Sequence, residues 1–359
     1  MNKKILLILS FLHKDLNMIN FINIKIRIKI KFIIYLFFLV FIIFIKKANI
    51  QFFLLTNQEL NKLNFCKKYG LLVYDYFTGE TLPKGIGGNI GDYIQSLAAL
   101  QFLPRNCRPI LVDRDTINLY HGPKIKIIMN GWYRLNDGNK LNSEYIYPVY
   151  ESIFIYNHWD IDINMIKNLI KYEPIGCRDL TTLKALNRKG IKAYFSSCLT
   201  TTLDIDYKAK NNERNEDIIF VDYRLGDYPE ADNFLYSLKA YNFSKMINIT
   251  HSFNLSYNHI ERLKYAKELI SRYAKAKLVT TTRIHAALPC LALQTPVIFI
   301  NSHYDYYRFP GLYELFNTIV VNYNKTFKIN VNLDKNGFVY NSDKYLIYAN
   351  NLKDKLKNI

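Results

Sequence analysis

The 359-residue chain is poor in residues that build covalent or metal-linked scaffolds. It has five cysteines, an odd number, widely spaced and without a Cys-x-x-Cys pair. This pattern fits neither a disulfide framework nor a zinc site, and it predicts buried free thiols. The seven histidines are also dispersed, and His251 and His259 are too loosely spaced to indicate a metal pair. No Asp-x-Asp motif is supported by further ligand residues. The sequence therefore predicts no bound metal.

Acidic residues are also scarce, with 30 Asp and Glu against 48 Lys and Arg, for a net charge of +18. Residues 1–50 hold nine Lys or Arg and one Asp, 9 − 1 = +8, so almost half of the excess lies in that segment. The remaining positive charge is scattered and forms no Arg-rich stripe or known nucleic-acid motif. We therefore predict that the protein does not bind nucleic acid.

The N-terminal segment contains one unbroken apolar run, FIIYLFFLVFIIFI, at residues 32–45. These 14 residues would extend about 21 Å as a helix, against about 30 Å for a bilayer core. Flanking lysines can lengthen the span by snorkelling. No convincing cleavage site follows the run, which favours an uncleaved anchor over a removed signal peptide. A segment lying on the membrane surface is the remaining alternative.

The sequence thus predicts a membrane-associated protein with contact through residues 32–45. Basic residues before the run would hold that end in the cytoplasm and place the body on the lumenal or extracytoplasmic side. The cytoplasmic face remains an alternative for a surface-bound protein. Four Asn-x-Ser/Thr sequences give weak support for a lumenal location, at Asn242, Asn248, Asn254 and Asn324.

The rest of the chain alternates strand and helix patterns, and its 50% hydrophobic content predicts a folded body. This alternation predicts an α/β protein with two Rossmann-like doubly wound domains facing a cleft. A hydrophilic stretch at 206–216 indicates the linker. We predict an anchor or signal-like segment at 1–55 and domains at 56–205 and 206–359. Strands are predicted at 71–76, 109–112, 126–130, 152–156, 191–195 and 217–223, and helices at 89–103, 179–190 and 261–276.

A glycine-containing loop lies between the first strand and the first helix of this body. Gly88 would allow the backbone to approach a ligand closely, and amide groups at the helix start would attract an anion. Asn89 and Asp92 follow at the helix start, where they also have an ordinary role as helix caps. The spacing alone does not distinguish ligand binding from a tight turn.

The most informative segment of the sequence is residues 278–300. It predicts a short strand, a polar turn, a short helix and a second buried strand, with Arg283 and His285 in the turn. Ligands bind at such strand ends in open α/β sheets. A guanidinium can bind a phosphate or carboxylate, and an imidazole can transfer a proton near neutral pH. This pair predicts an enzyme that acts on a small anion.

Three other segments are candidates for the same site. Arg178 precedes a predicted helix, where it either binds a ligand or fixes the turn. The hydroxyl-rich stretch at 196–202 either lines a sugar or phosphate pocket or forms a satisfied turn. The loop at 303–311 concentrates aromatic residues that would suit a sugar face, although such clusters usually serve packing.

Taken in order, these segments resemble the polysaccharide pyruvyl transferase family. The resemblance spans roughly residues 70 to 315. It is carried by GNIGDYIQSLA at 88–98, GCRD at 176–179, SCLTTTL at 197–203, TRIHAAL at 282–288 and TPVI at 295–298.

The resemblance implies a fold like that of two-domain, B-type glycosyltransferases. It implies transfer of a pyruvyl group from phosphoenolpyruvate to hydroxyls of a sugar or polysaccharide, with formation of a ketal and no cofactor. His285 is then the general acid/base, Arg283 and Arg178 bind the anion, and Gly88, Asn89 and Asp92 form part of the cleft. The alternatives are a glycosyltransferase that uses a nucleotide-sugar and a non-catalytic, membrane-tethered glycan-binding protein.

Overall fold

The chain divides into two compact units, Met1–Thr56 and Asn57–Ile359. The computed structural model describes residues 68–75, 88–104, 108–133, 141, 143–156, 161–203, 214–253, 257–302, 308–321 and 326–359. All of these lie in the second unit. The predicted anchor at 32–45 and most of the predicted linker at 206–216 lie outside the described residues. Within the parts of the chain that are described, no helix is both long and apolar enough to cross a bilayer.

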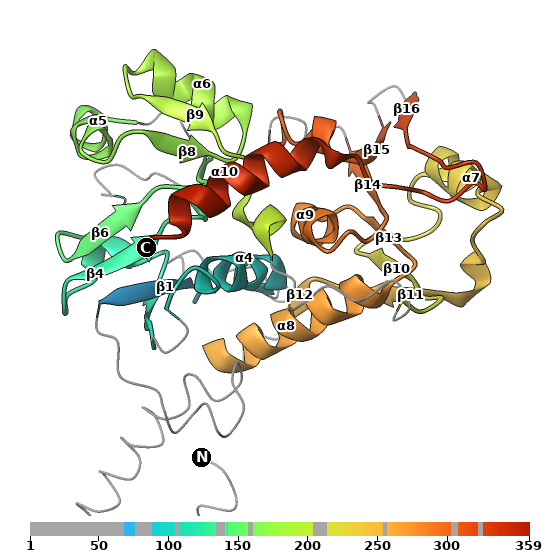
Figure 1. Ribbon diagram of the computed structural model, residues 1–359, viewed down its shortest axis with the longest axis horizontal. Helices are drawn as coiled ribbons and strands as arrows, with labels where there is room; N and C mark the ends of the chain where they lie inside the picture. Colours follow the sequence, from blue (N-terminus) through green and yellow to red (C-terminus); the bar gives the residue numbers. More distant parts are fainter. Residues whose placement is uncertain are drawn as a thin grey trace, which may run out of the picture. The chain divides into compact units, whose positions relative to one another are not determined.

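The first half of this unit is built on a parallel sheet of four strands (Figure 1). The central strand β1 (Tyr69–Val73) is flanked by β3 and β4, and its last four residues are buried. Strands buried on both faces read as continuous apolar runs, which is why this segment was recognisable in the sequence. The order is β3 (Ile110–Asp113), β1, β4 (Ile125–Ile128) and β6 (Ile146–Val149).

Smaller elements complete this half. Two parallel pairs are formed by β5 (Trp132–Tyr133) with β7 (Phe154–Ile155) and by β8 (Ile175–Cys177) with β9 (Ala193–Phe195). The helices and short 3-10 helices are η1 (Ile117–Leu119), α5 (Ile163–Ile170), α6 (Leu180–Arg188) and η3 (Leu199–Thr202).

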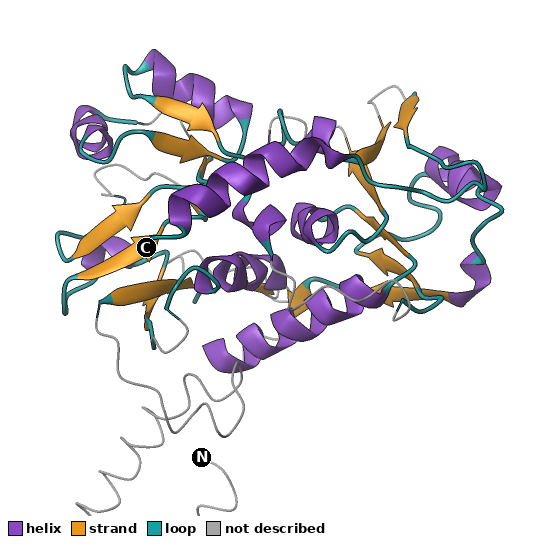
Figure 2. Cartoon of the chain, in the orientation of Figure 1, coloured by secondary structure: helices purple, strands orange, loops and turns teal. Residues whose placement is uncertain are grey.

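The second half is built on a sheet of six strands, five of them parallel (Figure 2). The antiparallel strand β16 (Phe327–Asn330) lies at one edge. The order of the others is β11 (Met246–Ile249), β10 (Ile218–Val221), β13 (Leu278–Thr281), β14 (Val297–Ser302) and β15 (Asn317–Val321). The remaining elements are α7 (Pro229–Ser237), η6 (Phe243–Lys245), β12 (Ser252–Phe253), α8 (His259–Lys275), α9 (Ile284–Ala292), η8 (Tyr313–Leu315), η9 (Asp343–Tyr345) and α10 (Leu346–Leu356).

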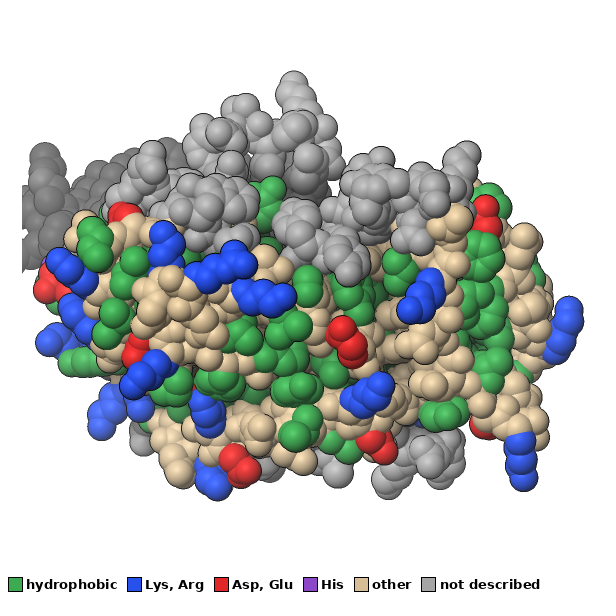
Figure 3. All heavy atoms as spheres, turned by 90° about the horizontal axis from the view of Figure 1, so that it is seen from above, with side chains coloured by type: hydrophobic (Ala, Val, Ile, Leu, Met, Phe, Trp, Pro, Cys, Tyr) green, Lys and Arg blue, Asp and Glu red, His purple; other side chains and the backbone are tan. Residues whose placement is uncertain are grey.

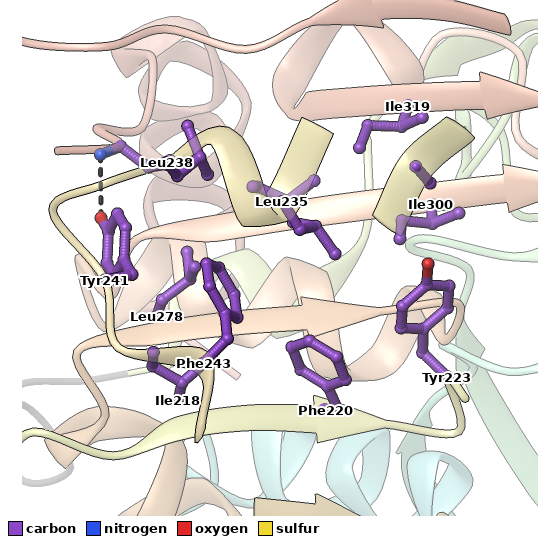
Figure 4. Packing of buried hydrophobic residues seen from close by; sticks show 13 residues of the cluster. Ile218, Phe220, Tyr223, Leu235, Leu238, Tyr241, Phe243, Leu278, Ile300 and Ile319 are labelled. Carbon is purple, nitrogen blue, oxygen red and sulfur yellow. Dashed lines mark hydrogen bonds between the residues drawn. The ribbon is translucent and has the colours of Figure 1, made fainter. Parts of the chain in front are cut away.

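One face of the six-stranded sheet carries a continuous hydrophobic cluster (Figure 4). Phe220 and Ile300 project from the strands toward Leu235 of α7, and all three are fully buried. The Tyr241 hydroxyl accepts a hydrogen bond from the backbone of Val339 at 2.9 Å, so the polar group at the rim of the cluster is satisfied. Burial of apolar side chains is the main favourable contribution to the stability of a domain.

The two halves are joined along α4 (Ile90–Leu100). This helix is buried on all sides except at its last residue, because it contacts β1, α8, α9 and η3. The short strand β2 (Gly88–Asn89) pairs antiparallel with β12. A Cβ atom on Gly88 would lie 2.2 Å from the ring of Phe253, so this pairing requires glycine. The start of α4 is therefore fixed against the second half of the chain.

The C-terminal helix α10, red in Figure 1, returns to the first half. Its Lys355 Nζ lies 3.4 Å from Glu151 Oε1, and Tyr69 donates a hydrogen bond to the main-chain oxygen of Ile359 at 2.6 Å. The end of the chain is therefore tied to the first sheet. On the face seen in Figure 3, Lys and Arg side chains lie singly or in small groups among hydrophobic and uncharged ones.

The α/β class predicted from the sequence is confirmed, and the strands lie within a few residues of their predicted positions. Two predictions were wrong in detail. The strand predicted at 152–156 is reduced to Phe154–Ile155, because Ser152 has a φ of 61° that an extended strand does not contain. The helix predicted at 89–103 ends at Leu100, ahead of Pro104.

Candidate active site

A pocket of about 70 Å³ lies where several helices begin. A single water needs roughly 10–15 Å³ of such space, so the pocket suits a small ion rather than an oligosaccharide. It is lined by Asn89, Asp92, Trp132, Arg178, His251, Thr282, Arg283, Ile284, His285, Arg308 and Phe309.

Five of the six site residues expected from the sequence therefore line one pocket. The exception is Gly88, which is buried beneath Phe253 and is not among the lining residues. Its role is to permit close strand pairing, because there is no room there for a side chain. That Gly88 contacts a ligand stays a prediction.

His285 lies in the first turn of α9 rather than in the loop before it. The helix begins after Arg283, whose backbone N–H donates to Thr281 Oγ1 at 2.9 Å. His285 is buried, and its Nε2 lies 3.5 Å from Nη1 of Arg178. Burial, and then the nearby charge of Arg178, keep the pKa of His285 well below its usual value. The imidazole of His285 is therefore neutral rather than one that titrates near neutral pH.

Arg178 is among the largest fully buried side chains in the described part of the chain. It follows β8, and Asp179 after it caps α6 by accepting from the backbone N–H of Thr182 at 2.8 Å. Its guanidinium carbon lies 4.9 Å from the centre of the Phe154 ring. Burial lowers the pKa of Arg178. Among the described residues its Nε has no hydrogen-bond partner, so the site holds a buried cation with an unused donor.

Arg283 is placed differently, because it already has a carboxylate partner. Its Nε donates to Asp222 Oδ2 at 2.6 Å, and its side chain is 45% exposed. Asp222 stands at the end of β10 with a φ of 48°, a conformation that non-glycine residues rarely adopt. Burial alone would raise the pKa of Asp222, but hydrogen bonds and the Arg283 charge outweigh burial and lower it. Asp222 therefore remains ionised and orients Arg283 at the mouth of the pocket.

The start of α4 contributes Asn89 and Asp92. Asn89 is the N-cap, and its side chain accepts from the Gly91 backbone at 3.0 Å. Asp92 does not cap the helix; it is buried, and Gln95 donates to it at 3.2 Å. A Cβ atom on Gly91 would lie 2.9 Å from Cβ of His285, so α4 meets α9 at close range. Residues at the starts of α4, α6 and α9 thus line the pocket, where N-terminal helix dipoles favour an anion.

Sequence reasoning missed several lining residues, of which His251 is the most notable. It is 1% exposed, and burial lowers its pKa to about 3. The signal that could have identified it is its position just after strand β11, at the carboxyl edge of the sheet. Trp132 is the first residue of the short strand β5. Arg308 and Phe309 belong to the aromatic loop noted in the sequence, of which residues 303–307 lie outside the described part.

The hydroxyl-rich segment at 196–202 does not line the pocket. It forms the buried 3-10 helix η3, in which Thr201 donates to the Cys198 carbonyl and Thr202 to the Leu199 carbonyl, both at 2.7 Å. Several hydroxyls of the segment are therefore satisfied within the fold, whereas the buried Ser197 hydroxyl has no hydrogen-bond partner among the described residues. In the described ranges no group of three or more His, Cys, Asp or Glu side chains is arranged to hold a metal ion.

The sequence was compared with known protein families. The family model described as "Polysaccharide pyruvyl transferase" matches residues 89–304, which is more than half of the chain. The chain belongs to this family. It is therefore an enzyme, a polysaccharide pyruvyl transferase. The matched range contains all of the pocket-lining residues except Arg308 and Phe309.

No curated protein matches the pyruvyl transferase chain. Among solved structures it is similar to an uncharacterized protein from Klebsiella pneumoniae, with 17% identity and a TM-score of 0.41. The similarity covers 72% of this chain and 94% of the other.

Proposed function

We propose that the enzyme transfers the pyruvyl group of phosphoenolpyruvate to two hydroxyls of a sugar or polysaccharide, forming a cyclic ketal. The observation that carries this proposal is the buried Arg178 with its unused donor beside the neutral imidazole of His285. A small anion is the ligand that satisfies such a cation, because its oxygens accept hydrogen bonds and compensate the charge.

The reaction needs a proton donor, a group that holds the anion and a route for the acceptor hydroxyls. Protonation of the methylene carbon of phosphoenolpyruvate makes the adjacent carbon electrophilic, and one sugar hydroxyl then adds to it. Loss of phosphate and attack by a second hydroxyl close the ketal. One hydroxyl proton ends on the new methyl group and the other on phosphate, so the equation balances without a cofactor.

His285 is proposed as the general acid/base. Its pKa is depressed by burial and by Arg178, so it arrives at the reaction neutral. A bound trianion would reverse the local charge and raise that pKa, which lets the imidazole acquire a proton together with the substrate. Proton transfer is thereby linked to occupancy of the site.

Arg178 is proposed to hold the anion at the closed end of the pocket and Arg283 at its mouth. The N-termini of α4 and α9 would add partial positive charge, and Asn89 and Asp92 would shape the wall. The acceptor would then meet the donor from the open side, because the pocket is too small to enclose a glycan.

The proposal also covers the arrangement of the domains and the location of the enzyme in the cell. We propose that the two sheets form two Rossmann-like domains in a B-type glycosyltransferase arrangement, divided near residue 205. Parallel sheets with α4 at their junction support this view. We also propose that residues 32–45 attach the enzyme to a membrane, on the strength of the apolar run in the sequence.

The test uses the full-length protein with phosphoenolpyruvate and a panel of methyl hexopyranosides, with phosphate release as the readout. His285→Ala should abolish release while the melting temperature stays within a few degrees of wild type. His121→Ala, at an exposed histidine outside the pocket, is the matched control. Full activity of the His285 variant would exclude its assigned role. Stabilisation by nucleotide-sugars but not by phosphoenolpyruvate would favour a glycosyltransferase.

A further inference from the structure

The pocket contains a second histidine whose position is fixed from several directions. The main-chain oxygen of His251 accepts from Ile90 at the start of α4 at 2.8 Å. Its backbone N–H donates to Asp222 Oδ2 at 3.0 Å. The side chain is fully buried yet lines the pocket. The backbone of His251 is therefore held from two sides, and its side chain forms part of the pocket wall.

Tyr273 of α8 determines which ring nitrogen of His251 carries the hydrogen. The Tyr273 hydroxyl is completely buried and lies 2.8 Å from Nε2 of His251. Among the described residues, this nitrogen is the partner available to the hydroxyl. Burial holds the pKa of Tyr273 well above its usual value, so the phenol keeps its proton and has to donate it. Nε2 is then the acceptor, and the hydrogen of the imidazole resides on Nδ1.

Nδ1 of His251 has no hydrogen-bond partner among the described residues. The pocket therefore presents two buried and unmatched N–H groups, one on His251 and one at Nε of Arg178. Leaving such donors without a partner is costly, and only an acceptor satisfies both. An oxyanion meets this requirement, since each of its oxygens accepts hydrogen bonds.

We propose that His251 is a second substrate-binding histidine, whose Nδ1–H donates a hydrogen bond to an oxyanion of the donor substrate. This inference rests on the proposed function in taking phosphoenolpyruvate as that donor. The two imidazoles then have different tasks. His285, beside Arg178, transfers the proton, while His251 stays neutral and holds the anion.

The surroundings of His251 agree with a neutral donor. Asp222 faces it from the end of β10, Arg283 from the N-cap of α9, His285 from α9 itself and Tyr273 from α8. Asp222 is compensated by Arg283, so it does not oppose a bound anion with a full negative charge. With its pKa depressed to about 3, His251 does not titrate in the physiological range. Its contribution to binding should be independent of pH there.

The test is calorimetric binding of phosphoenolpyruvate to the full-length protein and to three variants. His251→Ala removes the donor and should weaken binding about tenfold or more. His251→Asn places an amide N–H near the position of Nδ1 and should stay within about threefold of wild type. Tyr273→Phe removes the hydrogen bond to Nε2, so that His251 can adopt either tautomer, and it should weaken binding by an intermediate amount. Melting temperatures of all variants show which of them fold.

If His251 had only a structural role, the affinities of the three variants for phosphoenolpyruvate would not follow this order. Nitrogen-15 NMR of labelled histidines provides a second reading, and it should show Nδ1 protonated and Nε2 unprotonated for His251. An unchanged affinity of His251→Ala would overturn the proposal, as would a deprotonated Nδ1 in the complex with phosphoenolpyruvate.

Inorganic phosphate and pyruvate serve as separate probes of the two ends of the substrate. A loss of affinity in His251→Ala for one of them identifies the end that His251 contacts, and no loss for either contradicts the inference. If wild type binds phosphate but not phosphoenolpyruvate, the proposed function fails, while the phosphate data still decide the role of His251.

Discussion

Two buried arginines, each next to an aspartate in sequence, have opposite roles in this protein. Arg114 follows β3, and both Nε and Nη2 donate to Asp115, at 2.9 and 2.7 Å. Arg178 follows β8, but its neighbour Asp179 uses both carboxylate oxygens on Thr182 as the cap of α6. Both guanidinium groups lie over aromatic rings, so aromatic contact does not distinguish them.

The difference is visible in their pKa values. Burial, the largest single effect, would lower the pKa of Arg114, but the charges of Asp115 and Asp92, with the hydrogen bond to Asp115, together outweigh it and raise the pKa above its usual value. For Arg178, burial prevails and lowers the pKa. A buried charge that is compensated by its own fold is a structural feature, whereas one left uncompensated at a pocket is prepared for a ligand.

The strongest test of this comparison is Arg178→Met. The substitution removes a buried charge without separating an ion pair, so stability should be unchanged or slightly higher. Turnover of phosphoenolpyruvate should fall about 100-fold or more, because the anion loses its buried partner. Phosphate-release kinetics and a thermal melt measure the two effects. A variant that is destabilised but still active would reverse the interpretation.

Arg114→Met should give the opposite result. It leaves Asp115 without its partner in a largely buried position, with a side chain only 16% exposed. We expect the free energy of unfolding to fall by about 2–4 kcal/mol, while the affinity for phosphoenolpyruvate stays near wild type. Urea denaturation and calorimetry provide the measurements. Loss of affinity in a folded Arg114 variant would remove the distinction between the two arginines.

Gly91→Ala tests whether activity depends on the close contact of α4 with α9, which positions His285 beside Arg178. The added methyl group would lie 2.9 Å from Cβ of His285 and 3.2 Å from its Nδ1. We expect about a tenfold loss of kcat from the displaced imidazole. Gly131→Ala is the control, because its methyl group meets no atom closer than 3.6 Å. Equal activities of the two variants would show that the contact is unimportant.

The last prediction concerns the stability of the fold in acid. The pKa of His251 is about 3 in the folded protein and near 6.5 when unfolded, so between these values the unfolded state binds the extra proton. Stability should therefore fall as the pH falls from about 6.5 toward 3. His251→Asn should reduce this slope by up to about 1.4 kcal/mol per pH unit.

Melting temperatures at pH 4 to 7 measure the acid effect, with the exposed His121→Asn as the control. Added phosphate should protect the wild type at low pH, because an anion in the pocket compensates the charge that acid introduces. Added phosphate should not interact with Arg114, because Arg114 is already paired with Asp115. An identical slope in the His251 variant would show that its burial does not control acid stability.

The sequence predicted the elements better than it predicted their contacts. Apolar runs such as 278–281 are short-range signals, and Asp179 as a helix cap is decided by its immediate neighbours. The pairing of Arg283 with Asp222 joins residues 61 positions apart, and no local pattern indicates it. In the sequence His251 indicates no site, because its spacing from His259 is too loose for a metal pair. Its partners in the fold come from β10 and α8.

The sequence by itself determined the α/β class, the family motifs and the placement of Arg178, Arg283 and His285 at strand ends, because these depend on local spacing. Only the tertiary structure decided which arginine is paired with a carboxylate, which histidine is fixed by Tyr273 and why Gly88 has no room for a side chain. The physical reason is that desolvation and hydrogen-bond satisfaction depend on atoms brought together from distant parts of the chain.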